Sequence, residues 1–299
     1  MKVFLTGATG YTGSAIAQAL QKSGHRVTGL VRSKEDAKKL KTQGIRAHKG
    51  DLLNVATIEQ AAREADGVIH AAATNDANMA QVDTSVVRAI LAALRETGKP
   101  FIYTSGVWVM GNTGGQVADE SKPLDPTPLV AWRALLEGEI AAAAKQGIRT
   151  IIIRCADVYG RGGGLLAMFV QSTREHGAAR FVGSGENRWP FVHVGDLADL
   201  YVRALEKAPA GTLLIAAHGP SYRVRDLAEA ASIGAGAGGR TKSWPLEEAR
   251  KALGPFADAL ALDQQVSGNK AERLLGWSPQ GPSVLQDLKH GSYAKVRVA

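Results

Sequence analysis

The sequence has a single cysteine, Cys155, so no disulfide can form within the chain. Its seven histidines form no HExxH motif and no Cys/His cluster, which argues against a zinc site and predicts no bound metal. No apolar run approaches the ~18 residues of a membrane span. The apolar start Met1–Leu5 gives way to Thr6-Gly7 too early for the core of a signal peptide. The sequence therefore predicts a cytoplasmic protein without a membrane partner.

Acidic residues are the minority, with 28 against 36 basic residues and a net charge of +8. A mild positive field of this kind favours acidic small molecules such as phosphates. The one dense basic stretch, Lys34 to Lys41, is interrupted by Glu35 and Asp36 and contains no aromatic residue. That pattern does not favour nucleic-acid binding, so the expected partner is a small molecule.

A chain of 299 residues with 45% hydrophobic and 21% charged residues has the composition of a soluble globular protein of roughly two domains. Short apolar runs predict strands at Val3 to Thr6, Arg26 to Val31, Gly67 to Ala71, Phe101 to Thr104 and Thr150 to Ile153. Between them, the helical period fits Ala15 to Lys22, Ser33 to Lys41, Val55 to Glu64, Gln81 to Glu96 and Val130 to Gln146. Strand and helix in alternation predict an α/β fold, a doubly wound parallel Rossmann sheet with helices on both faces.

The alternation loosens after Arg154, where glycine-rich turns begin. One later helix and strand, Leu197 to Glu206 and Thr212 to Ala216, are suited to return to the main sheet. We therefore expect a dinucleotide-binding domain formed by residues 1–154 plus about 195–217. Residues 155–194 and 218–299 are expected to form a smaller substrate-binding lobe.

A glycine-rich turn follows the first strand directly and precedes a helical pattern. Gly7 can make the tight turn, Gly10 lets a pyrophosphate approach backbone N–H groups, and Gly13 lets helix and strand pack closely. Glycine triplets also occur in ordinary turns, but here the strand, the helix and the spacing agree. The turn predicts dinucleotide binding by Gly7, Thr9, Gly10, Tyr11, Thr12 and Gly13.

The second strand ends in Arg32, at the place where NAD-selective folds carry an acid for the ribose hydroxyls. A guanidinium there can pair with a 2′-phosphate and stack on adenine, with Ser33 and Lys34 in reach to assist. The alternative is a solvated arginine at the start of an exposed helix. We expect NADP(H) as the cofactor.

With these motifs the sequence resembles the short-chain dehydrogenase/reductase superfamily, in the extended or atypical branch related to nucleotide-sugar epimerases and dehydratases. The resemblance covers nearly the whole chain. It includes Gly50-Asp51-Leu52, His70-Ala71-Ala72-Ala73, Tyr103-Thr104-Ser105, Val158-Tyr159-Gly160 and His193-Val194-Gly195-Asp196-Leu197-Ala198.

The resemblance implies further cofactor contacts. An Asp-Leu pair would touch adenine, an alanine-rich strand end would pass under the ribose, and the segment after the sixth strand would border the nicotinamide. In this sequence those positions are Asp51, Leu52, Ala71, Ala72, Ala73, Thr104, Cys155, Ala156 and Val158. From the residues alone, Asp51 is better explained as a turn or capping residue before the helix at Val55, and only the resemblance places it in the site.

Members of this superfamily carry a Tyr-x-x-x-Lys pair for proton transfer, and no tyrosine of this chain has a lysine four residues later. Alignment with the family places Leu129 at the tyrosine position, Arg133 at the lysine position and Gly106 at the usual serine or threonine. Arg133 can hold ribose hydroxyls and face a developing alkoxide, but a guanidinium does not release a proton near neutrality.

A substitute proton donor is therefore expected among Tyr103, Ser105, Asp157 and a bound water. Tyr103 also fits the alternative of a core aromatic on a strand. Asp157 is the stronger candidate for substrate contact, because epimerase-like families place a polar residue there. Its alternative is an acid that hydrogen-bonds the backbone of a turn.

Tryptophan marks the expected substrate region. By resemblance, Trp189 stands where sugar-nucleotide enzymes carry a diphosphate-binding arginine, Trp108 lies where they carry smaller residues, and Trp132 is next to the altered helix motif. Aromatic residues are often core residues, but near a cleft they suit an apolar ligand.

The leading hypothesis is an NADPH-dependent reductase that acts on a carbonyl, or a similar double bond, of a small and largely apolar metabolite. The alternatives are a nucleotide-sugar epimerase or dehydratase, and a non-catalytic NADP(H)-binding sensor. The resemblance further implies a homodimer formed through two long helices.

Overall fold

The strand–helix alternation produces a seven-stranded parallel sheet in the computed structural model of the chain, which describes residues 1–294. The strand order is β11-β6-β5-β4-β1-β2-β3, so the winding direction reverses between β1 and β4. The strands are β1 (Lys2–Thr6), β2 (Arg26–Val31), β3 (Arg46–Lys49), β4 (Gly67–His70), β5 (Pro100–Gly106), β6 (Arg149–Cys155) and β11 (Thr212–Ala216). The doubly wound Rossmann prediction is confirmed.

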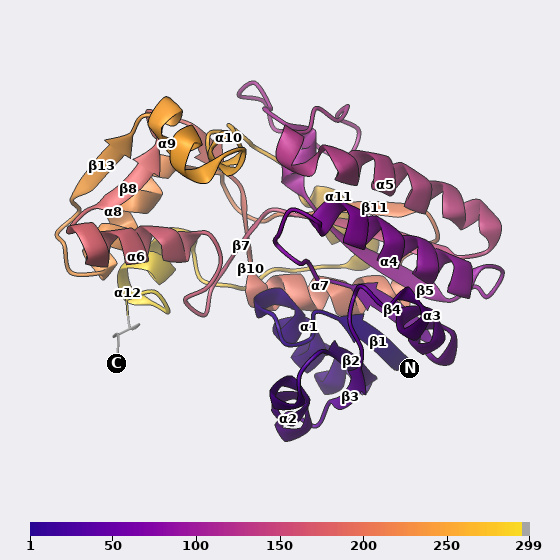
Figure 1. Cartoon of the computed structure of the whole chain (residues 1–299). Helices are drawn as coiled ribbons and strands as arrows, with labels where there is room; N and C mark the ends of the chain where they lie inside the picture. The colour runs from indigo at the N-terminus through magenta and orange to yellow at the C-terminus, as the bar shows by residue number, and fades with distance from the viewer. Residues whose placement is uncertain (295–299) are drawn as a thin grey trace.

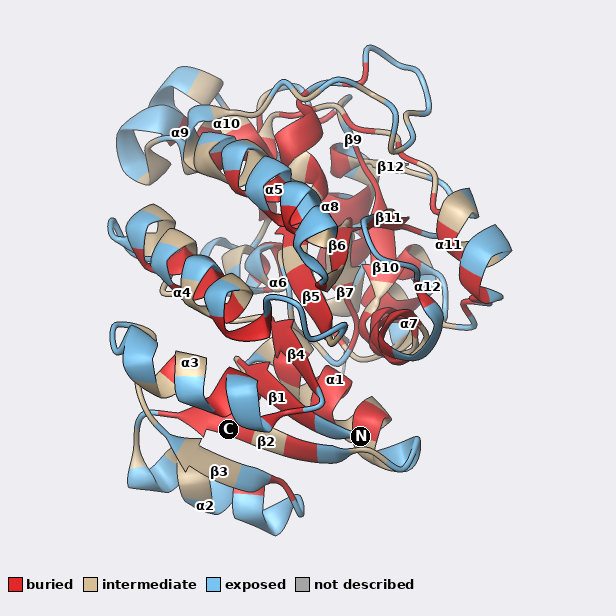
Figure 2. Cartoon of the chain, turned by 90° about the vertical axis from the view of Figure 1, so that its right-hand side faces the viewer, coloured by how far each residue is buried: buried red, intermediate tan, exposed pale blue. Residues whose placement is uncertain are grey.

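Helices cover both faces of the sheet (Figures 1 and 2). One hydrophobic cluster contains buried residues of α1 (Tyr11–Lys22), α2 (Lys34–Thr42) and α7 (Val194–Lys207). The opposite cluster contains those of α3 (Val55–Glu64), α4 (Met79–Leu94) and α5 (Ala131–Ala143). Short 3₁₀ helices lie at Val107–Met110, Pro128–Val130 and Ala144–Gln146.

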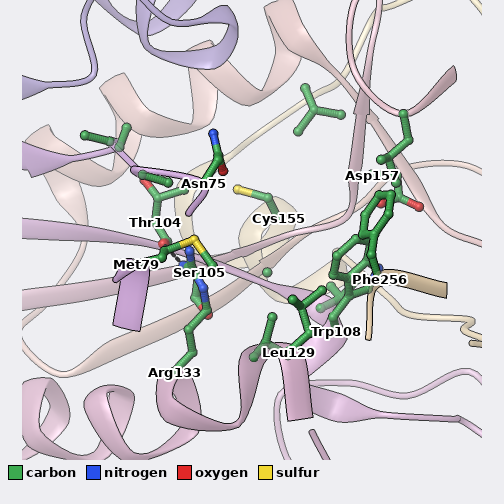
Figure 3. A pocket seen from close by; sticks show the side chains of 18 of the residues that line it. Asn75, Met79, Thr104, Ser105, Trp108, Leu129, Arg133, Cys155, Asp157 and Phe256 are labelled. Carbon is green, nitrogen blue, oxygen red and sulfur yellow. Dashed lines mark hydrogen bonds between the residues drawn. The ribbon is translucent and has the colours of Figure 1, made fainter. Parts of the chain in front are cut away.

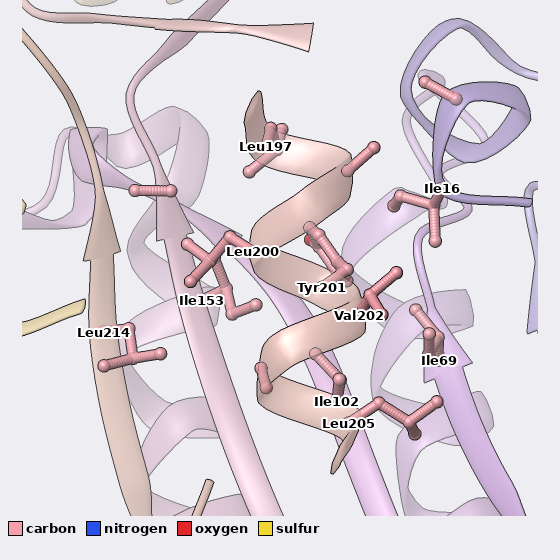
Figure 4. Close-up of a cluster of buried hydrophobic side chains, with 14 of the residues drawn as sticks. Ile16, Ile69, Ile102, Ile153, Leu197, Leu200, Tyr201, Val202, Leu205 and Leu214 are labelled. Atoms are coloured by element: carbon pink, nitrogen blue, oxygen red, sulfur yellow. The ribbon is translucent and has the colours of Figure 1, made fainter. Parts of the chain in front are cut away.

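The strands of this sheet are buried on both sides because their side chains alternate between the two clusters. In β1, for example, Val3 and Leu5 pack on the α1/α7 side and Phe4 on the α3/α4 side. Figure 4 shows the first of these interfaces, where Leu200 and Tyr201 of α7 lie against the sheet. The sheet is therefore a rigid support for the loops at its carboxyl edge.

A second group of elements packs around its own core, well separated from the sheet in Figure 1. Three two-stranded pairs form there: β7 (Asp157–Tyr159) with β10 (Phe191–His193), β8 (Ala179–Val182) with β13 (Thr241–Trp244), and β9 (Arg188–Trp189) with β12 (Tyr222–Arg223). The helices are α6 (Leu166–His176), α8 (Val224–Gly234), α9 (Leu246–Leu253), α10 (Phe256–Leu260) and α12 (Val284–His290). We call these elements the small lobe.

The structure departs from the sequence expectations at two places. The strand β3 was not expected, because Arg46–Lys49 is polar and only partly buried at the sheet edge. The segment around α11 (Asn269–Leu275) was assigned to the small lobe, but Ala271, Leu275 and Trp277 pack in the α1/α7 cluster of the main sheet. The expected helix and strand bounds otherwise shift by a few residues at their ends.

Candidate active site

The glycine-rich turn joins β1 to α1 and has no room for side chains at two of its glycines. A Cβ on Gly7, whose φ is +79°, would lie 2.6 Å from the Ala71 carbonyl oxygen, and a Cβ on Gly13 would lie 2.0 Å from the Gly7 carbonyl oxygen. A Cβ on Gly10 would meet only the Gly7 carbonyl oxygen, at 3.3 Å. Gly7 and Gly13 therefore allow the close packing of helix on strand, and the Gly10 side of the turn stays open for a ligand.

A cavity of about 360 Å³ opens over this turn. Its wall contains the residues expected to hold the pyrophosphate and the adenosine: Gly7, Thr9, Gly10, Tyr11, Thr12, Gly13, Arg32, Asp51, Leu52, Ala71, Ala72 and Ala73. The Arg32 side chain is exposed at its rim and makes no hydrogen bond or ion pair with a described residue. The α1 N-terminus and the open turn fit a nicotinamide dinucleotide.

A second and larger cavity of about 820 Å³ adjoins the first, since Ala71, Ala72, Ala73 and Asn75 line both. It lies at the carboxyl ends of β4, β5 and β6, where ligands bind in doubly wound sheets. Thr104, Cys155, Ala156 and Val158, expected beside the nicotinamide, are all in its wall. We call it the active-site cavity (Figure 3).

Arg133 projects from α5 into this cavity and is held by contacts with Thr104 and Trp132. Its Nη1 donates a hydrogen bond of 2.9 Å to the Thr104 carbonyl oxygen. The guanidinium carbon lies 4.6 Å from the centre of the Trp132 ring, a cation–π contact. Arg133 is thus positioned as a fixed positive charge on the cavity wall.

Next to Arg133, a buried chain of hydrogen bonds joins Thr6, His70, Asp83 and Tyr103. The Thr6 hydroxyl lies 2.6 Å from Nδ1 of His70, and Nε2 of His70 lies 2.6 Å from the Asp83 carboxylate. The other Asp83 oxygen accepts a 2.6 Å hydrogen bond from Tyr103. Burial would raise the pKa of Asp83, but the His70 hydrogen bond and the nearby charges of His70 and Arg133 hold it below its usual value.

Tyr103 and Ser105 do not have the free hydroxyls that proton donors to a substrate need. Tyr103 is fully buried, is absent from the cavity wall and donates to Asp83, and burial raises its pKa far above the usual range. Ser105 borders the cavity but donates at 2.5 Å to Glu137, which also pairs with Arg154. The catalytic expectation for Tyr103 is therefore corrected to a structural one, and Ser105 is committed to a buried ion-pair network.

Asp157 begins β7 and lies in the cavity wall near the rings of Trp108 and Phe256 (Figure 3). No described residue hydrogen-bonds to its carboxylate, and its backbone N–H donates to the Pro190 carbonyl. Burial raises the pKa of Asp157 to about 7, because nothing in its surroundings stabilises the charge. At neutral pH this carboxyl is able both to give and to accept a proton.

Cys155 sits between Arg133 and Asp157 in the cavity wall but is not suited to act as a nucleophile. Its Sγ lies 3.8 Å from the Tyr201 hydroxyl. Burial raises the pKa of the thiol to about 12. Cys155 therefore contributes shape and low polarity to the cavity.

The three tryptophans expected at the substrate region have different positions. Trp108 lines the active-site cavity and packs against Phe256, with ring centres 6.0 Å apart. Trp132 is outside the cavity wall and supports Arg133. Trp189 lies in the small lobe, stacked on Phe169. Only Trp108 has the position expected of a substrate contact.

Several residues of the cavity wall were not found from the sequence. Leu129 was identified only as the family's tyrosine position, and Asn75, Met79 and Phe256 carried no motif. Asn75 has a positive φ of 54°, which no local pattern announces. Phe256 comes from α10 and stands about 90 residues beyond Leu165, its nearest neighbour in the sequence among the other wall residues. Long-range contacts of this kind leave no signal in a single sequence.

Residues 1–294, which the structure describes, contain neither a candidate membrane span nor a candidate metal site. No helix there combines the length and apolar character needed to cross a membrane. No group of three or more His, Cys, Asp or Glu side chains in that range is arranged to hold a metal ion.

Comparison with known proteins agrees with this geometry. The model of the NAD-dependent epimerase/dehydratase family matches residues 3–216. An uncharacterized protein of Schizosaccharomyces pombe is 34% identical over 98% of this chain and 100% of its own. The 4-hydroxy-2-methyl-3-oxo-4-farnesyl-3,4-dihydroquinoline-1-oxide ketoreductase of Stigmatella aurantiaca is 26% identical over 93% of this chain and 92% of its own. The NAD-bound dTDP-glucose 4,6-dehydratase of Streptomyces venezuelae has the same fold, with a TM-score of 0.83, 21% identity, and coverage of 98% of this chain and 96% of its own.

Proposed function

We propose that this chain, which belongs to the NAD-dependent epimerase/dehydratase family, is an NADPH-dependent reductase of a carbonyl, or a similar double bond, in a small and largely apolar metabolite. One observation carries the proposal: an uncommitted carboxyl, Asp157, stands in an apolar cavity with its pKa raised to about 7 by burial. A family member without the Tyr-x-x-x-Lys pair needs another proton donor, and Asp157 meets the requirement.

The chain's own residues account for binding and orientation. Gly7, Gly10 and Gly13 would receive the pyrophosphate at the start of α1, and Arg32 would pair with a 2′-phosphate at the cavity rim. Arg133, the fixed charge on the cavity wall, would hold the ribose hydroxyls. When bound, the reduced nicotinamide supplies the hydride, which no side chain can do.

The remaining chemistry falls to Asp157 and Arg133. As the carbonyl accepts a hydride, negative charge develops on its oxygen, and Arg133 would stabilise that charge. Asp157 in its neutral form would then give its proton to the oxygen, leaving an alcohol and a carboxylate. Trp108, Leu129 and Phe256 give the cavity an apolar wall, which favours an apolar substrate.

The comparisons support a reductase as one of two enzyme classes. The Stigmatella relative is named as a ketoreductase of a farnesylated dihydroquinoline oxide, whereas the structural neighbour is named as a dTDP-glucose dehydratase. The apolar wall favours the first class. The nucleotide-sugar enzyme and the non-catalytic NADP(H) sensor are outcomes that the following experiment distinguishes.

The test is calorimetric titration of the nucleotide-free protein with NADPH and NADH, followed by an absorbance screen at 340 nm with aldehydes, ketones, imines and nucleotide sugars. We expect NADPH to bind more tightly and an apolar carbonyl to be reduced. Turnover only with nucleotide sugars would overturn the proposal in favour of the second class. NADPH binding with no turnover across the panel would favour the sensor.

Arg32→Ala tests the choice between the two cofactors. Loss of a charged hydrogen bond to the 2′-phosphate should weaken NADPH binding by about 1.5–3 kcal/mol and leave NADH binding nearly unchanged. Arg46→Ala is the matched control, because Arg46 is an exposed arginine at the far end of β3, outside the turn cavity. An equal loss for both nucleotides would remove Arg32 from the 2′-phosphate site.

A further inference from the structure

The small lobe contains a cavity of its own, of about 230 Å³. It is enclosed by α6, β8, β13 and the helices α9 and α10. Its wall is mainly aliphatic and aromatic, with Phe169 stacked on Trp189 at a ring-centre distance of 5.8 Å and an angle of 14°. We call it the Arg180 cavity, after the one permanently charged side chain in its wall.

Arg180 has no anionic partner. Its guanidinium makes no hydrogen bond or ion pair with a described residue, and its Nε is buried without a hydrogen-bond partner. The guanidinium carbon lies 4.3 Å from the centre of the Trp244 ring, a cation–π contact. No acidic side chain belongs to the cavity wall; Glu175 pairs at 3.8 Å with His176, a half-exposed residue of that wall.

The unpaired, buried Nε–H of Arg180 destabilises the folded protein unless a ligand accepts a hydrogen bond from it. A buried N–H without a partner has lost its hydrogen bonds to water and has gained no other. The desolvation free energy is larger for a charged donor than for a neutral one. The planar guanidinium donates two parallel hydrogen bonds most effectively to a carboxylate. The stacked rings beside it offer an apolar slot, slightly smaller than a drug-sized site of ~300–1,000 Å³.

We infer that the Arg180 cavity binds a small carboxylate with an apolar tail, its carboxylate on Arg180 and its tail between Phe169, Trp189 and Leu260. The cavity meets the active-site cavity only at Leu165, which lines both. The inference goes beyond the proposed function and does not depend on it, because the site contains neither Asp157 nor Arg133.

The first experiment measures binding without turnover. Two tryptophans, Trp189 and Trp244, stand in the cavity wall, so a ligand there should change the intrinsic fluorescence. The probes are octanoate, 1-octanol and octylamine, which share a tail and differ in the head group. We expect octanoate to bind at least about tenfold more tightly than 1-octanol, and octylamine to bind the weakest. Equal affinity of octanoate and 1-octanol would overturn the inference.

The second experiment changes the protein. Arg180→Met keeps apolar bulk and removes the charge, and it should lower octanoate affinity to the level of 1-octanol. Lys242→Ala is the matched control, since Lys242 is an exposed cation on the neighbouring strand and is absent from the cavity wall. An equal loss in both variants, or none in Arg180→Met, would contradict the assignment. If Arg180→Met does not fold, the comparison of probes on the wild-type protein still decides.

A third arm separates this site from the active site. Asp157→Asn should leave octanoate affinity unchanged, because Asp157 does not line the Arg180 cavity. Octanoate binding that fails in Asp157→Asn and persists in Arg180→Met would place the carboxylate in the active-site cavity. That result would overturn the inference and leave the reductase proposal in place.

Discussion

Two aspartates near the active-site cavity have opposite surroundings, and their chemistry differs for that reason. Asp83 is buried but accepts hydrogen bonds from His70 and Tyr103, so its pKa stays below the usual value. Asp157 has no such partner, and burial raises its pKa to about 7. At neutral pH one carboxyl is a permanent charge that orders its neighbours, and the other exchanges a proton.

The raised pKa of Asp157 has a consequence for stability. Between about pH 4 and pH 7 the unfolded chain has released this proton and the folded chain still holds it, so rising pH favours unfolding. Above pH 7 the Asp157 carboxylate is ionised in apolar surroundings. The decrease in the free energy of unfolding is then complete. Asp157→Asn should therefore raise the Tm at pH 8 by a few degrees and change it little at pH 4. Calorimetric melts at the two pH values measure this.

Asp66→Asn provides the control of opposite sign. A backbone hydrogen bond from Lys2 lowers the pKa of Asp66, so its stabilising contribution is present at pH 8 and is lost as the pH falls. This variant should lower the Tm at pH 8 rather than raise it. A Tm of Asp157→Asn that follows the wild type at both pH values would mean that Asp157 is ionised at its ordinary pKa.

Besides Asp157, Arg133 is the residue whose replacement should strongly lower kcat. Removing one preorganised donor from a developing oxyanion lowers kcat by about 10²–10³-fold in enzymes of comparable design. We expect a loss of that order in Arg133→Ala with the carbonyl substrate that the screen identifies, and partial recovery in Arg133→Lys. Steady-state kinetics measure it. Arg88→Ala removes an exposed arginine that pairs with Glu139 across α4 and α5, and should leave kcat unchanged.

At the scale of elements, the contact between α1 and β1 depends on one glycine. A Cβ at position 13 would lie 2.0 Å from the Gly7 carbonyl oxygen, so the helix would have to move away from the strand. Gly13→Ala should lower both the Tm and the affinity for either nucleotide, because the turn would lose its shape. Calorimetry measures the two effects on one sample.

Gly138→Ala is the control for Gly13→Ala, because it makes the same substitution at a helix position where the new methyl group contacts nothing. A Cβ at position 138 meets nothing within 4 Å on the exposed face of α5, and alanine is the better helix former. This variant should gain about 0.5–1 kcal/mol of stability and bind nucleotide normally. If the two variants behaved alike, the close approach of α1 to β1 would not be what requires glycine.

The elements that the sequence predicted are those with strong local patterns. The apolar runs of β1, β2, β4, β5 and β6 and the glycine turn are local signals, and the structure has them where expected. The strand β3 has no such signal, because a polar edge strand is defined by its neighbour β2. Likewise, the Asp83 partnership with His70 and Tyr103 joins α4, β4 and β5, which only the folded sheet brings together.

At the scale of the whole molecule, the main sheet and the small lobe are tied at several points. The Tyr11 hydroxyl in the first turn of α1 donates a 2.7 Å hydrogen bond to the Gly160 carbonyl, and its ring fills the space beside Gly163. Arg161, in the connection between β7 and α6, donates a 3.3 Å hydrogen bond to the Gln18 side chain of α1. The glycine turn and the small lobe are therefore mechanically coupled.

This coupling predicts one cooperative unfolding transition that the cofactor shifts as a whole. A ligand at 100 times its Kd stabilises the folded state by about 2.7 kcal/mol. NADPH at that concentration should raise the Tm of a chain of this length by about 4 °C without splitting the transition, as a scanning calorimeter would record. Tyr11→Phe removes the hydroxyl that bonds Gly160 and keeps the ring. If that hydroxyl is what transmits the effect, the variant should show a broader transition in which the small lobe responds less to NADPH. Two separate transitions in the wild-type protein, only one of them sensitive to NADPH, would show that the lobes unfold independently.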